Sequence, residues 1–298
     1  MKRLIVTADD FGAAREVNDA VEAAHRGGIL TAASLMVSAP AAADAVARAR
    51  RMPSLRVGLH LVLVEGRPLL PASRVPDLVD ADGRFRTNLA ALGARVACSR
   101  AARRQAGAEI SAQFAAFRDS GLTLDHCNAH KHFHLHPVVG SLLISIGRRF
   151  GLRAVRVPLE PVRLLRRVEP RTPATPAVLT VPFALALRRR LGAAGLFAPE
   201  QVFGIQWSGR MTRQRLAGLI RNLPPGLSEI YLHPATGSFP GAASGYRYRE
   251  ELEALMAAEV ATACREPALR LGGYSDFGEP ETTSVQNACH RRDLPHRV

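Results

Sequence analysis

The chain has 298 residues, 47% of them hydrophobic, which is enough for one domain with a large core. Its four cysteines are scattered without a CxxC pair, which argues against a disulfide scaffold or a zinc ribbon and fits a reducing compartment. The net charge of +14 is almost all arginine, but aromatic residues, at 5%, are few for the stacking platforms of nucleic-acid binders, so we expect no nucleic-acid partner.

Apolar runs of strand length alternate with helical patterns along the chain. The first half predicts strand Leu4–Ala8, helix Glu16–Arg26, strand Ala33–Val37, helix Ala41–Arg51, strand Leu55–Leu63, helix Ala101–Ser120 and strand Thr123–Asn128. The second half predicts helix Pro137–Phe150, strand Arg153–Val157, helix Thr212–Asn222, strand Glu229–Leu232, helix Arg249–Cys264 and strand Leu269–Leu271. Acids interrupt the first apolar run at once, so we expect a first strand rather than a signal peptide, and a cytoplasmic protein.

Repeated β-α units predict a parallel sheet, either doubly wound or closed into a barrel. No GxGxxG follows the first strand, so a dinucleotide-binding fold lacks its main support. About seven such units favour an α/β fold of the distorted (β/α) barrel type. We expect one domain over residues 1–277 and a polar, mobile tail over residues 278–298.

The densest chemical signal is a histidine run in residues 125–136. It contains His126, His130, His132, His134 and His136, all even-numbered, which an extended strand would place on one face. Imidazole is both a metal ligand and a proton carrier, so the run indicates metal-assisted chemistry. The alternatives are a metal-scavenging tract or solvated loop histidines, but helix-like segments flank the run, whereas scavenging tracts usually lie in disordered tails.

Other candidate residues stand where predicted strands end. Asp9 and Asp10 end the first strand, His60 lies in the third, and His233 follows strand Glu229–Leu232. Working residues of a (β/α) barrel lie at the C-terminal rim of its strands, so we expect these side chains to converge there with His130.

Asp10, His60 and His130 could bind one divalent ion and leave positions open for water and substrate. Zinc and magnesium are both compatible with this set. Asp9 would be the general base, which requires a bend near Phe11–Gly12, because adjacent strand residues point to opposite faces. His233 could be the general acid. The alternatives are an Asp pair that ends a strand or caps a helix, and structural histidines at positions 60 and 233.

These residues resemble the YdjC-like carbohydrate deacetylases, which include chitooligosaccharide deacetylases. The matching segments, in the family's order, are Thr-Ala-Asp-Asp-Phe-Gly (7–12), Gly-Leu-His-Leu (58–61), His-Cys-Asn-Ala-His-Lys-His-Phe-His (126–134) and Leu-His-Pro-Ala (232–235). The resemblance implies a distorted (β/α) barrel that removes the acetyl group from an N-acetylglucosamine-type sugar with one divalent metal ion.

By this resemblance, Asp10, His60 and His130 bind the metal, Asp9 is the base and His233 is the acid. Residues expected to contact substrate or support the site are His132, His134, Asn128, Arg156 and Phe11. The family often has Asp where this chain has Asn128, so a negative charge is lost at that position.

Segments 128–137, 203–209 and 229–237 look like the hopanoid-biosynthesis-associated members of the family. That similarity implies a glucosamine attached to a bacteriohopane polyol as the substrate. Segment Ala177–Leu187, followed by Arg188, Arg189 and Arg190, could then lie on the anionic inner membrane or cover the lipid. The alternative is a buried core helix with a basic C-terminal end.

Three other functions fit less well. The substrate could be a soluble chitooligosaccharide. The chain could also be a metal-dependent phosphodiesterase on a similar barrel, although two-metal phosphoester sites generally need more bridging carboxylates than Asp9 and Asp10 supply. A non-enzymatic reading is a basic metal- or nucleic-acid-binding module, which would bind DNA in a salt-sensitive way. No helix shows a sustained heptad seam, so the pattern indicates no oligomeric state.

Overall fold

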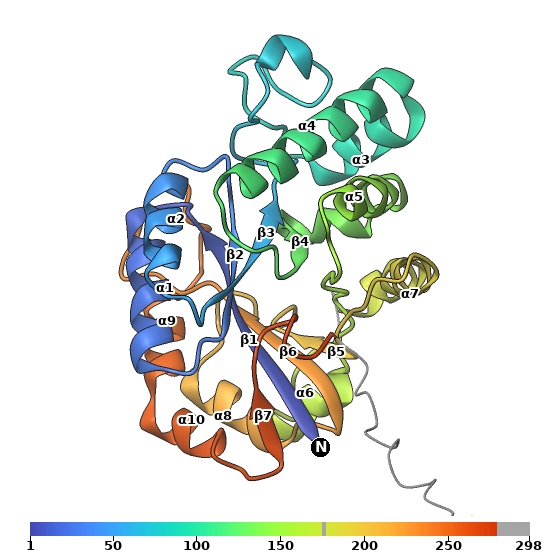
Figure 1. Cartoon of the computed structure of the whole chain (residues 1–298). Helices are drawn as coiled ribbons and strands as arrows, with labels where there is room; N and C mark the ends of the chain where they lie inside the picture. Colours follow the sequence, from blue (N-terminus) through green and yellow to red (C-terminus); the bar gives the residue numbers. More distant parts are fainter. Residues whose placement is uncertain (175–176, 279–298) are drawn as a thin grey trace, which may run out of the picture.

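A computed structural model describes residues 1–174 and 177–278; the expected tail therefore lies outside the described residues, apart from Gly278. Its parallel strands form one curled sheet, a half-barrel, which confirms an α/β fold (Figure 1). The sheet order is β4-β3-β2-β1-β6-β5, and β7 pairs with β1. The strands are β1 (Lys2–Phe11), β2 (Ala32–Leu35), β3 (Arg56–Leu61), β4 (Cys127–Ala129), β5 (Gln201–Phe203), β6 (Gly226–Leu232) and β7 (Leu269–Leu271).

Strand β1 is the centre of the sheet. It pairs with β6 along Lys2–Ala8, while β7 and β2 share its other edge. Residues Leu4–Asp9 are all buried, as expected for a strand covered on both faces. The side chains at the end of β1 therefore follow a buried strand that is paired on both edges.

Helices cover the outside of the curled sheet (Figure 1). They are α1 (Arg15–Gly27), α2 (Ala42–Arg50), α3 (Leu89–Cys98), α4 (Arg100–Asp119), α5 (Pro137–Arg149), α6 (Val162–Val168), α7 (Ala177–Ala193), α8 (Arg213–Arg221), α9 (Tyr248–Met256) and α10 (Ala258–Ala263), with short 3-10 helices η1 (Ala72–Arg74) and η2 (His130–Leu135). Side-chain caps fix several starts: Ser99 accepts a hydrogen bond from the Ala102 N–H at α4, and Pro137 occupies the first turn of α5.

The structure corrects the expected elements in three places. Segment Arg153–Val157 is not a regular strand, because it joins its neighbours only through single bridges from Val155 to Cys127 and from Ala154 to Phe197. The helix expected over Arg249–Cys264 is divided at Ala257, where the backbone becomes extended. The strand expected over Thr123–Asn128 is shorter and begins later, as β4 (Cys127–Ala129), and the chain turns directly after it.

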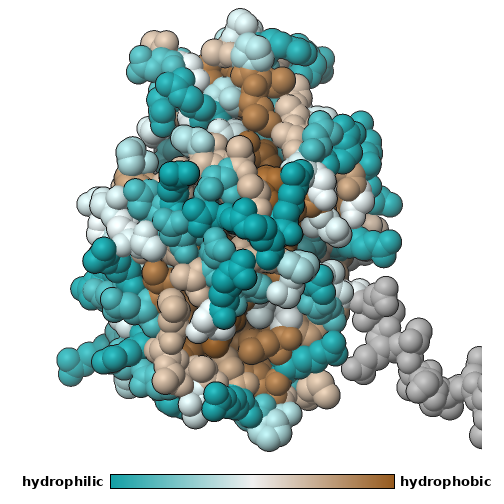
Figure 2. Space-filling model, turned by 60° about the vertical axis from the view of Figure 1, so that its left-hand side comes forward, coloured by the Kyte–Doolittle hydropathy of each residue, from teal (hydrophilic) through white to brown (hydrophobic). Residues whose placement is uncertain are grey.

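The surface is mainly hydrophilic on the side of α1, α2 and α9, which Figure 2 brings forward, with apolar residues in patches. Over residues 1–174 and 177–278, no helix is long and apolar enough to cross a bilayer. Segment Ala177–Leu187 lies in α7 and is not a fully buried core helix, because Leu179 and Leu185 are exposed.

Strand β3 and His126, the residue before β4, approach each other so closely at Gly58 that only glycine fits. A Cβ atom there would lie 2.5 Å from the ring and from the carbonyl oxygen of His126. We expect Gly58→Ala to lower the free energy of unfolding by about 3 kcal/mol through overpacking, measured by chemical denaturation.

The control is the same substitution in α4. A Cβ on Gly107 would meet only Leu142, at an ordinary 3.5 Å. Gly107→Ala should therefore stabilise the protein by about 0.5–1 kcal/mol through helix propensity. Equal effects of the two substitutions would contradict the close contact at Gly58.

Candidate metal centre

Two consecutive acids reach the same site because β1 bends at the second one. Asp10 has a left-handed backbone with φ 62°, and the register between β1 and β2 shifts between Ala8 and Phe11. The bend was expected at Phe11–Gly12 and lies at Asp10 itself. A left-handed non-glycine residue costs about 1 kcal/mol or more, so the surrounding contacts must hold this conformation.

The histidine run is a tight turn and not an extended strand, so the expectation of one shared face is wrong. Lys131 and His132 have φ of 50° and 54° within η2, which sends successive rings in different directions. Of the five rings, only that of His130 joins the other predicted metal ligands.

The remaining rings of the run have separate partners. His126 bonds Ser34 Oγ at 3.0 Å and Asp125 at 2.9 Å, within the core. His134 is buried and bonds the backbone oxygen of Arg156 at 2.9 Å. His136 packs beside Phe133.

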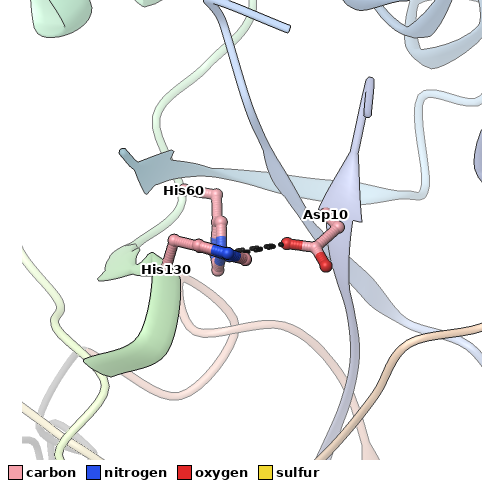
Figure 3. A group of neighbouring side chains, drawn as sticks. All are labelled: Asp10, His60 and His130. Carbon is pink, nitrogen blue, oxygen red and sulfur yellow. Dashed lines mark hydrogen bonds and ion pairs between the residues drawn. The ribbon is translucent and has the colours of Figure 1, made fainter. Parts of the chain in front are cut away.

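Asp10, His60 and His130 form a nearly equilateral triangle of ligand atoms (Figure 3). Asp10 Oδ1 lies 3.2 Å from His60 Nε2 and 3.2 Å from His130 Nδ1, and the two nitrogens are 3.4 Å apart. A tetrahedral zinc ion with bonds of about 2.0–2.1 Å separates its ligand atoms by roughly 3.3–3.4 Å. The three groups therefore fit one cation.

The negative charge of Asp10 is neutralised by a positive charge within the triangle, as a bound cation would neutralise it. Burial opposes charging of His130, but the Asp10 carboxylate and Glu65 outweigh it and raise the pKa of His130 to about 9. Burial also opposes ionisation of Asp10, yet His130 and His60 hold the pKa of Asp10 well below its usual value. Protonated His130 thus neutralises Asp10, and a metal ion would replace that proton.

Each histidine of the triangle has a second partner that orients its ring. His60 Nδ1 donates to Asn128 Oδ1 at 2.7 Å, which leaves Nε2 free to coordinate. His130 Nε2 lies 3.4 Å from Glu65 Oε2. Such outer carboxylate and amide partners fix the tautomer of a metal-binding histidine.

Glu65 is a site residue that the sequence reasoning missed. Its hydrogen bond with His130 is the main cause that lowers its pKa to about 2, and it also pairs with Lys131. The sequence contained one clue to this residue, because Glu65 is an acid that shortly follows the strand carrying His60. In the structure it lies at a turn made by Glu65 and Gly66, both with positive φ.

Asp9 is held by a buried guanidinium. Arg156 Nη1 donates to Asp9 Oδ2 at 2.5 Å, and Nη2 lies 3.0 Å from Asp9 Oδ1 and 2.7 Å from Glu229 Oε1. Arg156 is fully buried and Asp9 only 2% exposed. Burial opposes the charge of Asp9, but Arg156 and His60 hold the pKa of this carboxyl well below its ordinary value.

Asn128 links Asp9 to the triangle. Its amide nitrogen donates to Asp9 Oδ1 at 3.0 Å and to Ser34 Oγ at 3.0 Å, while its oxygen accepts from His60. An aspartate here could accept from His60 but could not donate to Asp9. The amide thus connects a carboxylate and an imidazole without adding a charge.

His233 and His132 lie on the partly exposed side of the site. His233 is held through its backbone N–H, which donates to Glu251, and its ring centroid lies 5.1 Å from that of Tyr246. Burial lowers the pKa of His233, although the charges of Asp10 and Asp9 oppose this. His132 Nε2 bonds the Tyr231 hydroxyl at 2.9 Å.

The supporting residues predicted from sequence lie at different depths. Phe11, Arg156 and His134 are fully buried, so they can orient the site but present no surface to a ligand. Asn128 is also buried, and only the ring of His132 is partly exposed.

A model of the YdjC-like protein family matches residues 3–266. The chain belongs to the YdjC-like family. Among the relatives of this YdjC-like chain are proteins named carbohydrate deacetylase. The one from Geobacillus stearothermophilus is 32% identical over 279 residues, 92% of this chain and 97% of the relative. The one from Brevibacillus brevis is 28% identical and covers 93% and 100% of the two chains, and the one from Mus musculus is 32% identical and covers 80% of each.

The fold is also found in a solved structure from Enterococcus faecalis, named as a candidate cellobiose-phosphate cleavage protein. That structure aligns with a TM-score of 0.71 and 23% identity, over 93% of this YdjC-like chain and 99% of the other. At this identity the match shows a shared fold.

We expect Glu65→Gln to weaken Zn²⁺ binding to the metal-free protein about 10- to 100-fold, because a neutral amide polarises His130 less than the carboxylate does. Isothermal titration calorimetry measures the affinity. Asp10→Asn and His60→Ala should remove most of the binding, since each deletes a ligand.

The matched control is Glu253→Gln, on an exposed glutamate of α9. Its affinity for Zn²⁺ should equal that of the unchanged protein. Unaltered affinity in Glu65→Gln would show that Zn²⁺ binding by His130 does not depend on the charge of Glu65.

Proposed function

We propose that this protein is a metal-dependent carbohydrate N-deacetylase. The observation that carries the proposal is the triangle of Asp10 Oδ1, His60 Nε2 and His130 Nδ1, with sides of 3.2–3.4 Å, beside the buried carboxylate of Asp9. The relatives named carbohydrate deacetylase support the reaction class.

Asp10, His60 and His130 would hold the ion. Two imidazoles and one carboxylate favour Zn²⁺ over Mg²⁺, because magnesium prefers oxygen ligands in an octahedron. Bound there, a divalent ion would supply Lewis-acid polarisation of an amide carbonyl and would make water more acidic.

Asp9 is proposed as the general base. Arg156 keeps it ionised, and together with Asn128 it fixes the orientation of the carboxylate. The charge of Arg156 also makes Asp9 a weak proton acceptor in the resting state, so the base must act on a water already made acidic.

His233 is proposed as the general acid for the leaving amine. Its ring has a nitrogen, Nδ1, without a hydrogen-bond partner among the described residues, and it lies beside Tyr246. Because burial favours the neutral ring, His233 must take up a proton before it can donate one to the amine.

The proposed substrate is an N-acetylglucosamine-type sugar. The partly exposed Tyr246 ring beside His233 offers an apolar face for a sugar ring. We further propose that the sugar is attached to a hopanoid lipid and that the enzyme contacts the membrane peripherally, with a soluble chitooligosaccharide as the alternative substrate.

A two-metal phosphodiesterase is less consistent with this site. The triangle contains one carboxylate, and residues 1–174 and 177–278 contain no second cluster of three or more potential metal-ligating residues. Two-metal phosphoester sites place their ions about 3.5–4 Å apart, and bridging carboxylates typically hold both.

Acetate release from an N-acetylglucosaminyl hopanoid and from a soluble chitooligosaccharide tests the proposed reaction. We expect activity with Zn²⁺, loss after chelation, and a rate at least about 100-fold lower for Asp9→Asn, since the base is removed. Glu253→Gln should keep full activity. Normal turnover by Asp9→Asn would refute the base assignment.

The role of His233 is tested by changing the leaving group. His233→Asn should slow amide deacetylation about 100-fold or more, because the departing amine needs a proton. Hydrolysis of an aryl acetate, whose phenolate leaves without protonation, should fall far less. An equal loss on both substrates would place His233 in binding or structure rather than in proton donation.

A further inference from the structure

Helix α7 carries an unusual concentration of exposed apolar side chains. In the described part of the chain, half of the large exposed hydrophobic residues belong to this helix, namely Val178, Leu179, Phe183 and Leu185. Leu179 is 69% exposed and Leu185 is 54% exposed. Single exposed leucines need no explanation, but a cluster on one helix marks an interaction surface.

The helical period places these apolar residues in two adjacent stripes, and each stripe has an arginine at its C-terminal end. Val178, Leu185 and Arg189 follow one stripe of α7, and Leu179, Phe183 and Arg190 follow the next, since each step is four or seven residues, about one or two helical turns. We call Val178, Leu179, Phe183, Leu185 and Arg189 the α7 face.

The opposite side of α7 is packed against the protein. Ala184, Leu187 and Leu191 are buried, and α7 contacts α5 and η2. In Figure 1, α7 lies at the right-hand edge, next to α5. The helix is thus anchored by one side and offers the other to a partner.

The electrostatics around α7 favour an anionic partner. Helix α7 itself contains three arginines, Arg188, Arg189 and Arg190, and no acidic residue. Arg188 and Arg190 are committed to the fold, because they donate to the backbone oxygens of Pro199 and Pro137.

Arg189 is free for a ligand. It is exposed and has no partner among the described residues. An apolar helix face with a free cation at one end has the composition of a helix that lies in the headgroup region of an anionic membrane.

We propose that the α7 face docks this protein on an anionic phospholipid membrane. The apolar side chains would enter the acyl boundary, and Arg189 would pair with lipid phosphate or other headgroup anions. Docking is independent of the deacetylase reaction, but its use in bringing a lipid-linked sugar to the site rests on the proposed function.

The surface lies close to the candidate active site. Helix α7 packs against η2, the turn that begins with the metal ligand His130. Leu135 from η2 and Phe183 and Leu187 from α7 line a small apolar pocket between the two elements. A membrane-docked α7 would therefore hold the histidine turn near the lipid surface.

Sedimentation with phosphatidylcholine vesicles that contain phosphatidylglycerol tests the proposal. We expect the unchanged protein to bind these vesicles, and to bind pure phosphatidylcholine vesicles much less. The double variant Leu179→Ser and Leu185→Ser should partition about tenfold or more weakly, because two exposed leucines no longer enter the lipid. Arg189→Gln should also weaken binding, and added salt should weaken it further.

Matched controls are Leu89→Ser with Met256→Ser, which alter exposed apolar residues on other helices, and Arg104→Gln, which alters an exposed arginine of α4. These should bind vesicles normally. Equal binding by the α7 variants and the controls, or no vesicle binding by the unchanged protein, would overturn the proposal. So would a dimer in light scattering that the α7 variants dissociate, since the face would then bind a second copy.

A soluble-substrate assay separates this proposal from the proposed function. The α7 variants should release acetate from a soluble chitooligosaccharide at the normal rate while losing vesicle binding. Asp10→Asn should do the reverse, with normal vesicle binding and no turnover. Vesicle binding without any deacetylase activity would leave the docking surface standing and overturn the reaction.

Discussion

The buried guanidinium of Arg156 organises this protein. It lies between the carboxylates of Asp9 on β1 and Glu229 on β6. Its Cζ atom also lies over the Tyr231 ring, 4.4 Å from the ring centroid. A buried charge is tolerated only when it is paired and hydrogen-bonded, and removal of one partner typically costs about 3–5 kcal/mol. Arg156 therefore fixes how β1, β6 and the segment after α5 meet.

The same interaction reaches the candidate metal centre through hydrogen bonds. Arg156 holds Asp9, Asn128 donates to Asp9, and Asn128 in turn accepts from His60. The ring of a metal ligand is thus oriented by a chain of contacts that begins in the core. On the other side of the triangle, Glu65 orients His130 from a partly exposed turn.

The two ends of this arrangement differ in burial. At the core end, Asp9, Asn128 and Arg156 are buried, and hydrogen bonds from the last two hold the Asp9 carboxylate in one orientation. The outer end is formed by η2, whose turn carries His130 and packs against α7. Any partner that binds α7 is therefore placed next to the part of the site that a substrate must approach.

The sequence alone predicted the fold class and the family. Apolar periodicity predicted an α/β fold, because β-α alternation leaves a local pattern in the sequence. The order of the motifs indicated the YdjC-like family, which the match to the family's model then showed. The residue types of the predicted metal set also came from sequence, since carboxylate and imidazole groups stood at the ends of predicted strands. That Asp10, His60 and His130 meet, though, is a property of the fold.

Tertiary structure decided how these side chains are aimed. The bend at Asp10, the turn in η2 and the contact of Glu65 with His130 were not predicted. Even-numbered histidines share a face only in an extended chain, and two positive φ angles remove that regularity. The physical reason is that a local pattern sets which element a residue favours, whereas its direction depends on contacts with residues far away in the chain, such as Asn128 and Arg156 around Asp9.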